Sequence, residues 1–163
     1  TANNGGAIYL SNGTLSVTNG TFKGNYAASQ GASIYQNGGT STITSSKFYG
    51  NKTGSSWAPG IAVVSGAKTI VKDSTFYGNT SGCTNVSNGV IMTYDSGYHL
   101  TLQGTNKFFN NTSVSSGTIQ NDIGIWTAAG TNEVTFDTSS TSYLNSGIYF
   151  YKSGNMISIF IEC

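Results

Sequence analysis

One phrase recurs along this chain about every 28 residues. It begins at a glycine, continues through two short strand-like runs and ends in the pattern Phe-x-x-Asn. The clearest copies begin at Gly5, Gly31, Gly60 and Gly89 and end with Phe22–Asn25, Phe48–Asn51, Phe76–Asn79 and Phe108–Asn111. A fixed period of this size is typical of stacked copies of one supersecondary unit. The repeat therefore predicts a solenoid rather than a closed globule.

Each copy contains two β-prone runs in which apolar and polar residues alternate, the period of a half-buried strand. The first run follows the glycine, at Ala7–Tyr9, Ser33–Tyr35, Ala62–Val64, Ile91–Thr93 and Ile148–Phe150. The second run follows at Leu15–Val17, Thr42–Thr44, Thr69–Val71, Leu100–Leu102, Glu133–Thr135 and Ile157–Ile159. Counting Gly117 and Gly147 as further starts, we expect one all-β domain over residues 1–163, a parallel β-solenoid of about six coils. Its coils are expected to be regular over residues 1–116 and degenerate over residues 117–163.

Stacking aligns equivalent residues of successive coils in rows along the axis, which we call ladders. The inward Phe ladder is expected to contain Phe22, Phe48, Phe76, Phe108 and Phe136. The Asn ladder is expected to contain Asn25, Asn51, Asn79 and Asn111. Asn tolerates left-handed backbone geometry at a turn, and stacked amides can hydrogen-bond along the axis. Ser139 takes the place of Asn in the fifth coil, and Cys163 lies near the Phe position of the sixth.

Composition excludes several classes of protein. Only 8% of residues are charged, arginine is absent and the net charge is +1, which argues against nucleic acid or an anionic membrane surface as partner. The 37% of hydrophobic and 12% of aromatic residues fall at regular intervals, which argues against disorder. No apolar run approaches the roughly 20 residues needed for a membrane-spanning helix, so no membrane insertion is expected.

The combination of Gly-[Gly/Ala]-x-[Ile/Val] with Phe-x-x-Asn resembles the repeat of chlamydial polymorphic outer membrane proteins. It is equally similar to the adhesin-like surface proteins of methanogenic archaea. The resemblance covers roughly residues 3 to 112, with weaker coils to the end. It implies a right-handed parallel β-helix belonging to a surface-exposed or secreted adhesin, without identifying a receptor.

Right-handed β-helices also include polysaccharide lyases and hydrolases, so the carboxylates are candidates for catalytic groups. Asp95 and Asp122 lie at similar distances after their coil glycines and form the best candidate pair. We interpret them as residues of a solvated turn, with Lys152 beside Asp122. His99 is the only histidine and is expected at a strand edge. No metal site, phosphate loop or cofactor is predicted.

Two exposed rows are candidates for contact with a ligand. The residues after the ladder Phe, Tyr49, Tyr77 and Phe109, point outward by alternation and form a possible ligand or assembly surface, unless they only pack on one another. A second aromatic set contains Tyr9, Tyr35 and Tyr151. A hydroxyl row on the second strands, such as those that order water in ice-binding proteins, contains Ser16, Thr42, Thr101, Thr135 and Ser158, with Val71 expected to interrupt it.

Several features suit an extracellular or cell-surface location. The polar, uncharged chain contains Asn-x-Ser/Thr sequons at Asn12, Asn19, Asn51, Asn79, Asn85, Asn110 and Asn111, which are possible glycosylation sites. Cys83 and Cys163 lie about three coils apart, roughly 14 Å, which is too far for a disulfide unless the last coil folds back. The start without Met, on a coil boundary, suggests a processed protein or a slice of a longer array.

The sequence therefore predicts a non-catalytic β-solenoid that acts as an adhesin or as a structural fibre subunit. Its expected partners are other copies stacked end to end, or a protein or glycan of a cell surface. Unpaired strands at the ends of a solenoid, here including the apolar stretch Met156–Ile161, favour axial addition. A carbohydrate-binding or carbohydrate-degrading β-helix is the main alternative, and ice binding is a more remote one.

Overall fold

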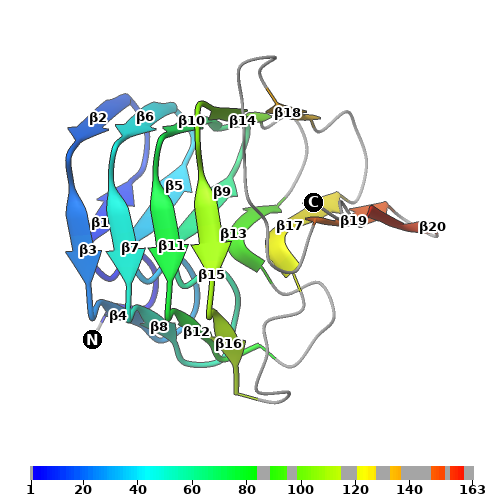
Figure 1. Cartoon of the computed structure of the whole chain (residues 1–163), viewed down its shortest axis with the longest axis horizontal. Helices are drawn as coiled ribbons and strands as arrows, with labels where there is room; N and C mark the ends of the chain where they lie inside the picture. The colour runs from blue at the N-terminus through cyan, green and yellow to red at the C-terminus, as the bar shows by residue number, and fades with distance from the viewer. Residues whose placement is uncertain are drawn as a thin grey trace.

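The chain winds into a stack of β-coils that succeed one another along the long axis of the molecule (Figure 1). The computed structural model describes residues 2–83, 89–94, 99–114, 121–127, 133–136, 148–152 and 155–159. Strands, turns and bends account for the structure of these residues, and helices are absent from them. No described segment is therefore a helix long and apolar enough to cross a membrane. The fold is the predicted parallel β-solenoid.

Each complete coil contributes one strand to each of four sheets, numbered here in chain order. The first sheet contains β1 (Ile8–Leu10), β5 (Ile34–Asn37), β9 (Ile61–Val64), β13 (Gly89–Tyr94), β17 (Asn121–Thr127), β19 (Ile148–Lys152) and β20 (Asn155–Ile159). The second contains β2 (Thr14–Thr18), β6 (Thr40–Thr44), β10 (Lys68–Lys72), β14 (His99–Gln103) and β18 (Glu133–Phe136). The third contains β3 (Thr21–Lys23), β7 (Lys47–Tyr49), β11 (Thr75–Tyr77) and β15 (Lys107–Phe109). The fourth contains β4 (Tyr26–Ala27), β8 (Lys52–Thr53), β12 (Thr80–Ser81) and β16 (Thr112–Ser113).

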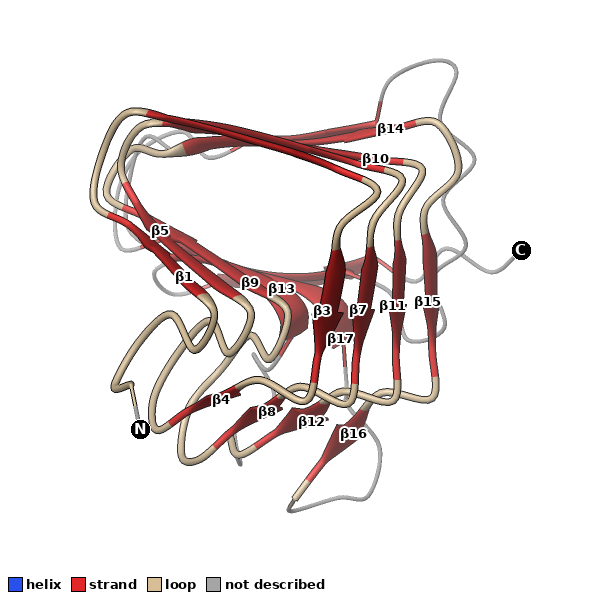
Figure 2. Cartoon of the chain, turned by 90° about the vertical axis from the view of Figure 1, so that its left-hand side faces the viewer, coloured by secondary structure: helices blue, strands red, loops and turns tan. Residues whose placement is uncertain are grey.

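The coils form a right-handed solenoid, as the family resemblance implies. Figure 2 views the stack from its N-terminal side, and the chain runs clockwise from the first sheet through the second and third to the fourth as the coils recede. Equivalent residues of successive coils are paired in register, so that the sequence repeat and the structural repeat coincide. Phe22 is paired with Phe48, and Phe76 is paired with both Phe48 and Phe108.

The turn between the third and fourth sheets needs a left-handed residue in every complete coil. Gly24, Gly50 and Gly78 supply it with φ angles of 65°, 63° and 60°, and Asn110 supplies it in the fourth coil with a φ of 54°. Glycine adopts this geometry without the Cβ penalty, and Asn tolerates it better than most residues. The left-handed position is therefore the residue before each ladder Asn, and the prediction that the ladder Asn itself takes this geometry is wrong.

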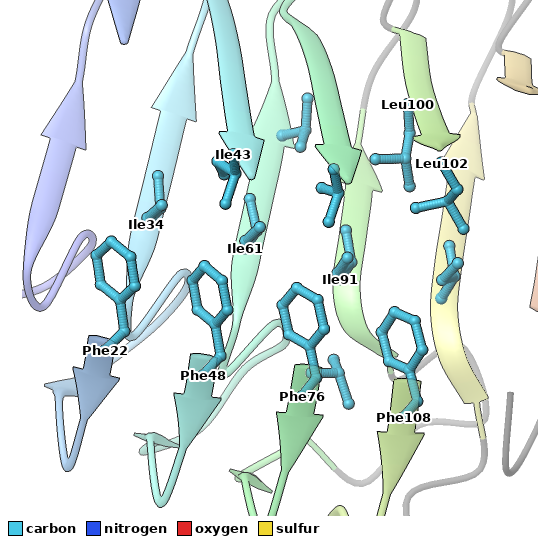
Figure 3. Packing of buried hydrophobic residues seen from close by; sticks show 14 of the residues in the cluster. Phe22, Ile34, Ile43, Phe48, Ile61, Phe76, Ile91, Leu100, Leu102 and Phe108 are labelled. Atoms are coloured by element: carbon cyan, nitrogen blue, oxygen red, sulfur yellow. The ribbon is translucent and has the colours of Figure 1, made fainter. Parts of the chain in front are cut away.

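The core lies inside the coils and is built from the apolar residues that alternate inward from the sheets. Figure 3 shows the four rings of Phe22, Phe48, Phe76 and Phe108 in one row, facing side chains from the first and second sheets. Neighbouring rings stack with centroids 4.6, 4.5 and 4.8 Å apart. The spacing matches the distance between neighbouring strands. The inner side of every coil thus repeats the same packing with the next coil.

The coil count and the C-terminal coils differ from the sequence prediction. About four complete turns are present rather than six, because after β16 the described residues supply strands only to the first and second sheets. The run Ile157–Ile159, predicted as a second-sheet strand, belongs to β20 and pairs antiparallel with β19 in the first sheet. Only Ser153 and Gly154 separate these strands in the sequence. A loop of two residues closes a hairpin and is too short for a parallel crossover.

Phe136 also lies elsewhere than predicted. It is the last residue of β18 in the second sheet and is paired with Leu102, not with the ladder residue Phe108. In the complete coils a polar turn of four or five residues separates the inward residue of the second strand from the ladder Phe, as between Val71 and Phe76. No such turn precedes Phe136, which directly extends the run that starts at Glu133. The Phe ladder therefore contains four described members rather than five.

Candidate functional site

The Asn ladder is a buried chain of hydrogen bonds that runs along one corner of the solenoid. The Nδ2 atom of each Asn donates to the Oδ1 atom of the Asn one coil further on, at 2.9 Å for the pairs Asn25–Asn51, Asn51–Asn79 and Asn79–Asn111. The same Oδ1 atoms accept the backbone N–H of the preceding Asn. The Nδ2 atoms of Asn51, Asn79 and Asn111 also donate to the carbonyl oxygens of Phe22, Phe48 and Phe76. These contacts use both N–H donors of the side-chain amides of Asn51 and Asn79.

A second ladder at the opposite end of the third-sheet strands was not predicted. The backbone N–H groups of Gly20, Ser46 and Ser74 donate to the Oγ atom of Ser46, the Oγ atom of Ser74 and the Oδ1 atom of Asn106, at 3.0, 3.1 and 3.0 Å. The sequence signal was a small or polar residue two positions before each ladder Phe. Together the two ladders connect the turns at both ends of each third-sheet strand to the equivalent turns of the next coil.

The Asn ladder changes which sequons can accept a glycan. Asn51 and Asn79 are fully buried, and their Nδ2 atoms, where a glycan would be attached, are hydrogen-bonded. Asn111 is buried as well. In the folded chain the exposed acceptors are Asn12, Asn19 and Asn110. Asn85 lies outside the described residues.

The aromatic strip, defined as Tyr49, Tyr77 and Phe109, lies on the outer side of the third sheet. Its rings stack nearly parallel, with centroids 4.9 Å apart for Tyr49 and Tyr77 and 5.2 Å apart for Tyr77 and Phe109. The ammonium group of Lys23 lies 5.5 Å from the ring centroid of Tyr49. Both faces of the two tyrosine rings are therefore occupied, by Lys23, by the other tyrosine or by Phe109. The strip presents ring edges and phenol hydroxyls to solvent.

Lysines surround this strip. Lys23, Lys47 and Lys107 are exposed on β3, β7 and β15, and these strands and β11 contain no acidic residue. Lys52 is exposed on the adjoining strand β8. The described acidic residue closest in sequence to these strands is Asp73, in the turn before β11. Its Oδ1 atom accepts the backbone N–H of Thr105 at 2.8 Å. The outer side of the third sheet is thus both basic and aromatic.

The first sheet carries a further aromatic set on its outer side. Tyr9 and Tyr35 stack with ring centroids 5.2 Å apart, and Tyr9 is 54% exposed. Trp57, from the loop before β9, stacks on Tyr94 at 5.4 Å. Trp57 and Tyr35 also pack against a small apolar cluster of Ala58, Ala62 and Met92. The sequence did not indicate this cluster, because Trp57 comes from a loop rather than from the strand repeat.

The sequence pattern groups Tyr151 with Tyr9 and Tyr35, but Tyr151 does not lie in their row. The register aligns Tyr35 with Ala62, Met92, Gly124 and Tyr149 in successive coils. Tyr151 is instead aligned with Trp126, which follows Tyr94 in its row. The prediction is therefore wrong by two residues.

The hydroxyl row of the second sheet is interrupted, but not by the predicted residue. Val71 points inward and is fully buried, whereas Ile70 is aligned with Thr42 on one side and Thr101 on the other. Ser158 belongs to β20 in the first sheet and is outside this row. Ile70 has no hydroxyl, so it interrupts the hydroxyl row between Thr42 and Thr101 and argues against an ice-binding face.

Of the candidate carboxylates and cysteines, Asp122 and Cys83 lie among the described residues and both are buried. Asp122 is fully buried in β17, so its interpretation as a solvated turn residue is wrong. Asp95, its proposed partner, lies outside the described residues, as does Cys163. Cys83 is buried next to Ser81, whose Oγ atom accepts its backbone N–H at 3.2 Å. No group of three or more His, Cys, Asp and Glu side chains suited to a metal ion occurs within the described part of the chain.

Comparisons with protein-family models, with curated proteins and with solved structures found no match.

Proposed function

We propose that this chain is a non-catalytic solenoid that acts at a cell surface or outside the cell, as an adhesin or as a subunit of a structural fibre. The observation that carries this proposal is the pair of continuous ladders along the axis. Stacked Phe rings and buried Asn amides repeat the same contacts in every complete coil. Such a body is rigid, and it displays the same outward positions at regular spacing.

The aromatic strip is the proposed contact surface of this rod. Phe109 is 39% exposed and the two tyrosines are half-buried, so a partner can cover further apolar area there. Because the ring faces of Tyr49 and Tyr77 are occupied, the strip is suited to contact through ring edges and hydroxyls. Aromatic stacking of a sugar ring on either tyrosine is not favoured by this arrangement. The resemblance to bacterial and archaeal surface repeats supports the same adhesive role.

Adhesion can be tested by replacing the strip without touching the core. Triple replacement of Tyr49, Tyr77 and Phe109 by Ser is expected to lower the attachment of chain-coated beads to cells or to each other. A matched control replaces Thr14, Ser16 and Thr40 by Ala on the exposed side of the second sheet, and is expected to leave attachment unchanged. Unchanged attachment of the strip variant would contradict the proposed role of the strip. Hydrolysis of a polysaccharide by the purified chain would contradict the non-catalytic proposal.

End-to-end assembly is a second part of this proposal. The first coil provides the edge strands β1, β2 and β3 of the first, second and third sheets, whereas β4 is bridged to Ala2. The inward residues Ile8, Leu15 and Val17 of this coil are only half-buried. The equivalent residues Ile34 and Ile43 in the next coil are fully buried. Unpaired strands over a partly open core favour the addition of another coil, from the same protein or from a second copy. Sedimentation of the chain as a monomer at high concentration would contradict self-assembly through this end.

A further inference from the structure

The outer side of the third sheet combines positive charge, hydroxyl groups and a linear shape. Its two outward columns are Thr21, Lys47, Thr75 and Lys107, and Lys23, Tyr49, Tyr77 and Phe109. Strand spacing makes this face about 14 Å long, with Lys47 and Lys107 about 10 Å apart. Both columns run along the solenoid axis. An extended chain laid along the axis would meet an ammonium group at each end of the face and hydroxyl groups between them.

The occupied ring faces restrict what such a chain can be. Single-stranded nucleic acids are held by bases that stack on free aromatic faces. Here Lys23 and Tyr77 cover Tyr49, and Tyr49 and Phe109 cover Tyr77. Apart from the exposed part of Phe109, what remains available is a set of donors: the lysine ammonium groups and the phenol and threonine hydroxyls. Neither phenol hydroxyl has a hydrogen-bond partner among the described residues. Donors of this kind suit carboxylate or sulfate groups together with sugar hydroxyls.

The distribution of charged residues along the sequence also favours a negatively charged ligand. Six of the seven lysines precede residue 115, with only Asp73 and Asp95 as acidic residues in that part of the sequence. Four of those six, Lys23, Lys47, Lys52 and Lys107, lie on the third sheet or on the adjoining strand β8. A negatively charged ligand is therefore attracted to this side of the regular coils.

We infer that the outer side of the third sheet binds an extended, negatively charged polysaccharide that runs along the solenoid axis. Lys47 and Lys107 contact its acidic groups, and the hydroxyls of Tyr49, Tyr77 and Thr75 donate hydrogen bonds to the sugar units between them. Lys23 stays over the ring of Tyr49 and adds to the positive potential at one end. This inference rests on the proposed adhesive role and supplies its ligand class.

The test uses the whole chain and polygalacturonate, with the neutral polymer dextran as a control ligand. Polygalacturonate is expected to bind, with affinity that falls as salt is raised because exposed charges are screened beyond a Debye length. The double variant Lys47→Gln/Lys107→Gln is expected to lower the affinity about tenfold. The matched control, Lys68→Gln/Lys72→Gln on the second sheet, removes the same charge and is expected to change the affinity less than about twofold. Tyr49→Phe/Tyr77→Phe keeps the ring stack, removes both hydroxyls and is expected to lower the affinity about threefold.

Several results would overturn the inference. Equal losses from the two lysine pairs would mean that general charge, rather than this face, attracts the polymer. Equally tight binding of polyglutamate or of a single-stranded oligonucleotide would mean that the partner is an acidic peptide or a nucleic acid. If the lysine pair has no effect while the strip variant still lowers attachment to cells, the adhesive role stands and the anionic ligand is wrong. If polygalacturonate binds as expected while attachment is unaffected by the strip variant, the ligand class stands and the adhesive role is wrong.

Discussion

The first four coils and the C-terminal coils are built from similar strands but not from the same contacts. Both regions contribute parallel strands to the first and second sheets, from β1 and β2 up to β17 and β18. Only the first four coils contribute described strands to the third and fourth sheets, where the Phe and Asn ladders lie. The comparison teaches that runs of alternating apolar and polar residues are enough to extend the first and second sheets. Described strands of the third and fourth sheets occur only in the coils that contain the complete Phe-x-x-Asn phrase and the turn before it.

Removal of a ring from the Phe ladder tests the region on which this difference depends most. Phe76→Ala is expected to lower the free energy of unfolding by about 3 to 5 kcal/mol, because the fully buried ring stacks on two others and its loss leaves a cavity. The control Phe109→Ala removes a ring that is 39% exposed and is expected to cost about 1 kcal/mol. Denaturant unfolding followed by circular dichroism measures both. Equal losses would mean that the ladder is no more important than the outer strip.

Removal of an amide from the Asn ladder is expected to have the next largest effect. Asn79→Ala leaves the backbone N–H and the Nδ2 group of Asn51 and the carbonyl of Phe48 without their buried partner. A loss of about 2 to 3 kcal/mol in the free energy of unfolding is expected. The control Asn12→Ala removes an exposed amide and is expected to change the free energy of unfolding by less than about 0.5 kcal/mol. A loss at Asn79 no larger than that at Asn12 would show that the ladder does not hold the coils together.

Alanine substitutions at two turn glycines can distinguish the cost of left-handed backbone strain from the cost of a steric clash. Gly104 and Gly78 have nearly the same φ, 59° and 60°, but a Cβ at Gly104 would clash with Oδ1 of Asp73, whereas a Cβ at Gly78 would have no atom within 4 Å. Gly78→Ala is expected to cost about 1 kcal/mol from the left-handed backbone alone. Gly104→Ala is expected to cost about 1 kcal/mol more, because Asp73 must move away from the N–H of Thr105. Thermal unfolding of the two variants measures the difference, and equal melting temperatures would contradict it.

The smallest expected effect restores the phrase in the fifth coil. Ser139→Asn completes Phe-x-x-Asn after Phe136, and the sequence pattern alone predicts a more stable coil. Phe136 is paired with Leu102 in the second sheet, so the described strand that precedes position 139 belongs to the second sheet, whereas each ladder Asn follows a strand of the third sheet. The free energy of unfolding is therefore expected to change by less than about 0.5 kcal/mol. Stabilisation by 1 kcal/mol or more would indicate that the fifth coil does adopt the ladder arrangement.

The repeat in the sequence did not predict the strands of the third and fourth sheets, but it was enough to predict the first-sheet and second-sheet strands of the first four coils, the parallel register and four members of each ladder. These follow from local alternation and from a period that aligns like residues, both of which can be read without knowing the packing. The sequence was insufficient where a residue depends on its neighbours in space. The residues of the second ladder, Ser46, Ser74 and Asn106, share only a small or polar character before the ladder Phe, which does not reveal their hydrogen bonds. The contact of Trp57 with Tyr94 joins the loop before β9 to β13.

The sequence by itself thus determined that this chain is a β-solenoid and which residues of its first four coils lie in the Phe and Asn ladders, because the period places equivalent residues one strand spacing apart. Only the tertiary structure decided which residue turns the chain, where the repeat stops and what the outer strip can offer a partner. The left-handed residue lies before Asn51 rather than at it, and Phe136 is in the second sheet. The stacked rings of Tyr49 and Tyr77 expose edges instead of faces. These features depend on distances between coils, which the order of residues along the chain does not contain.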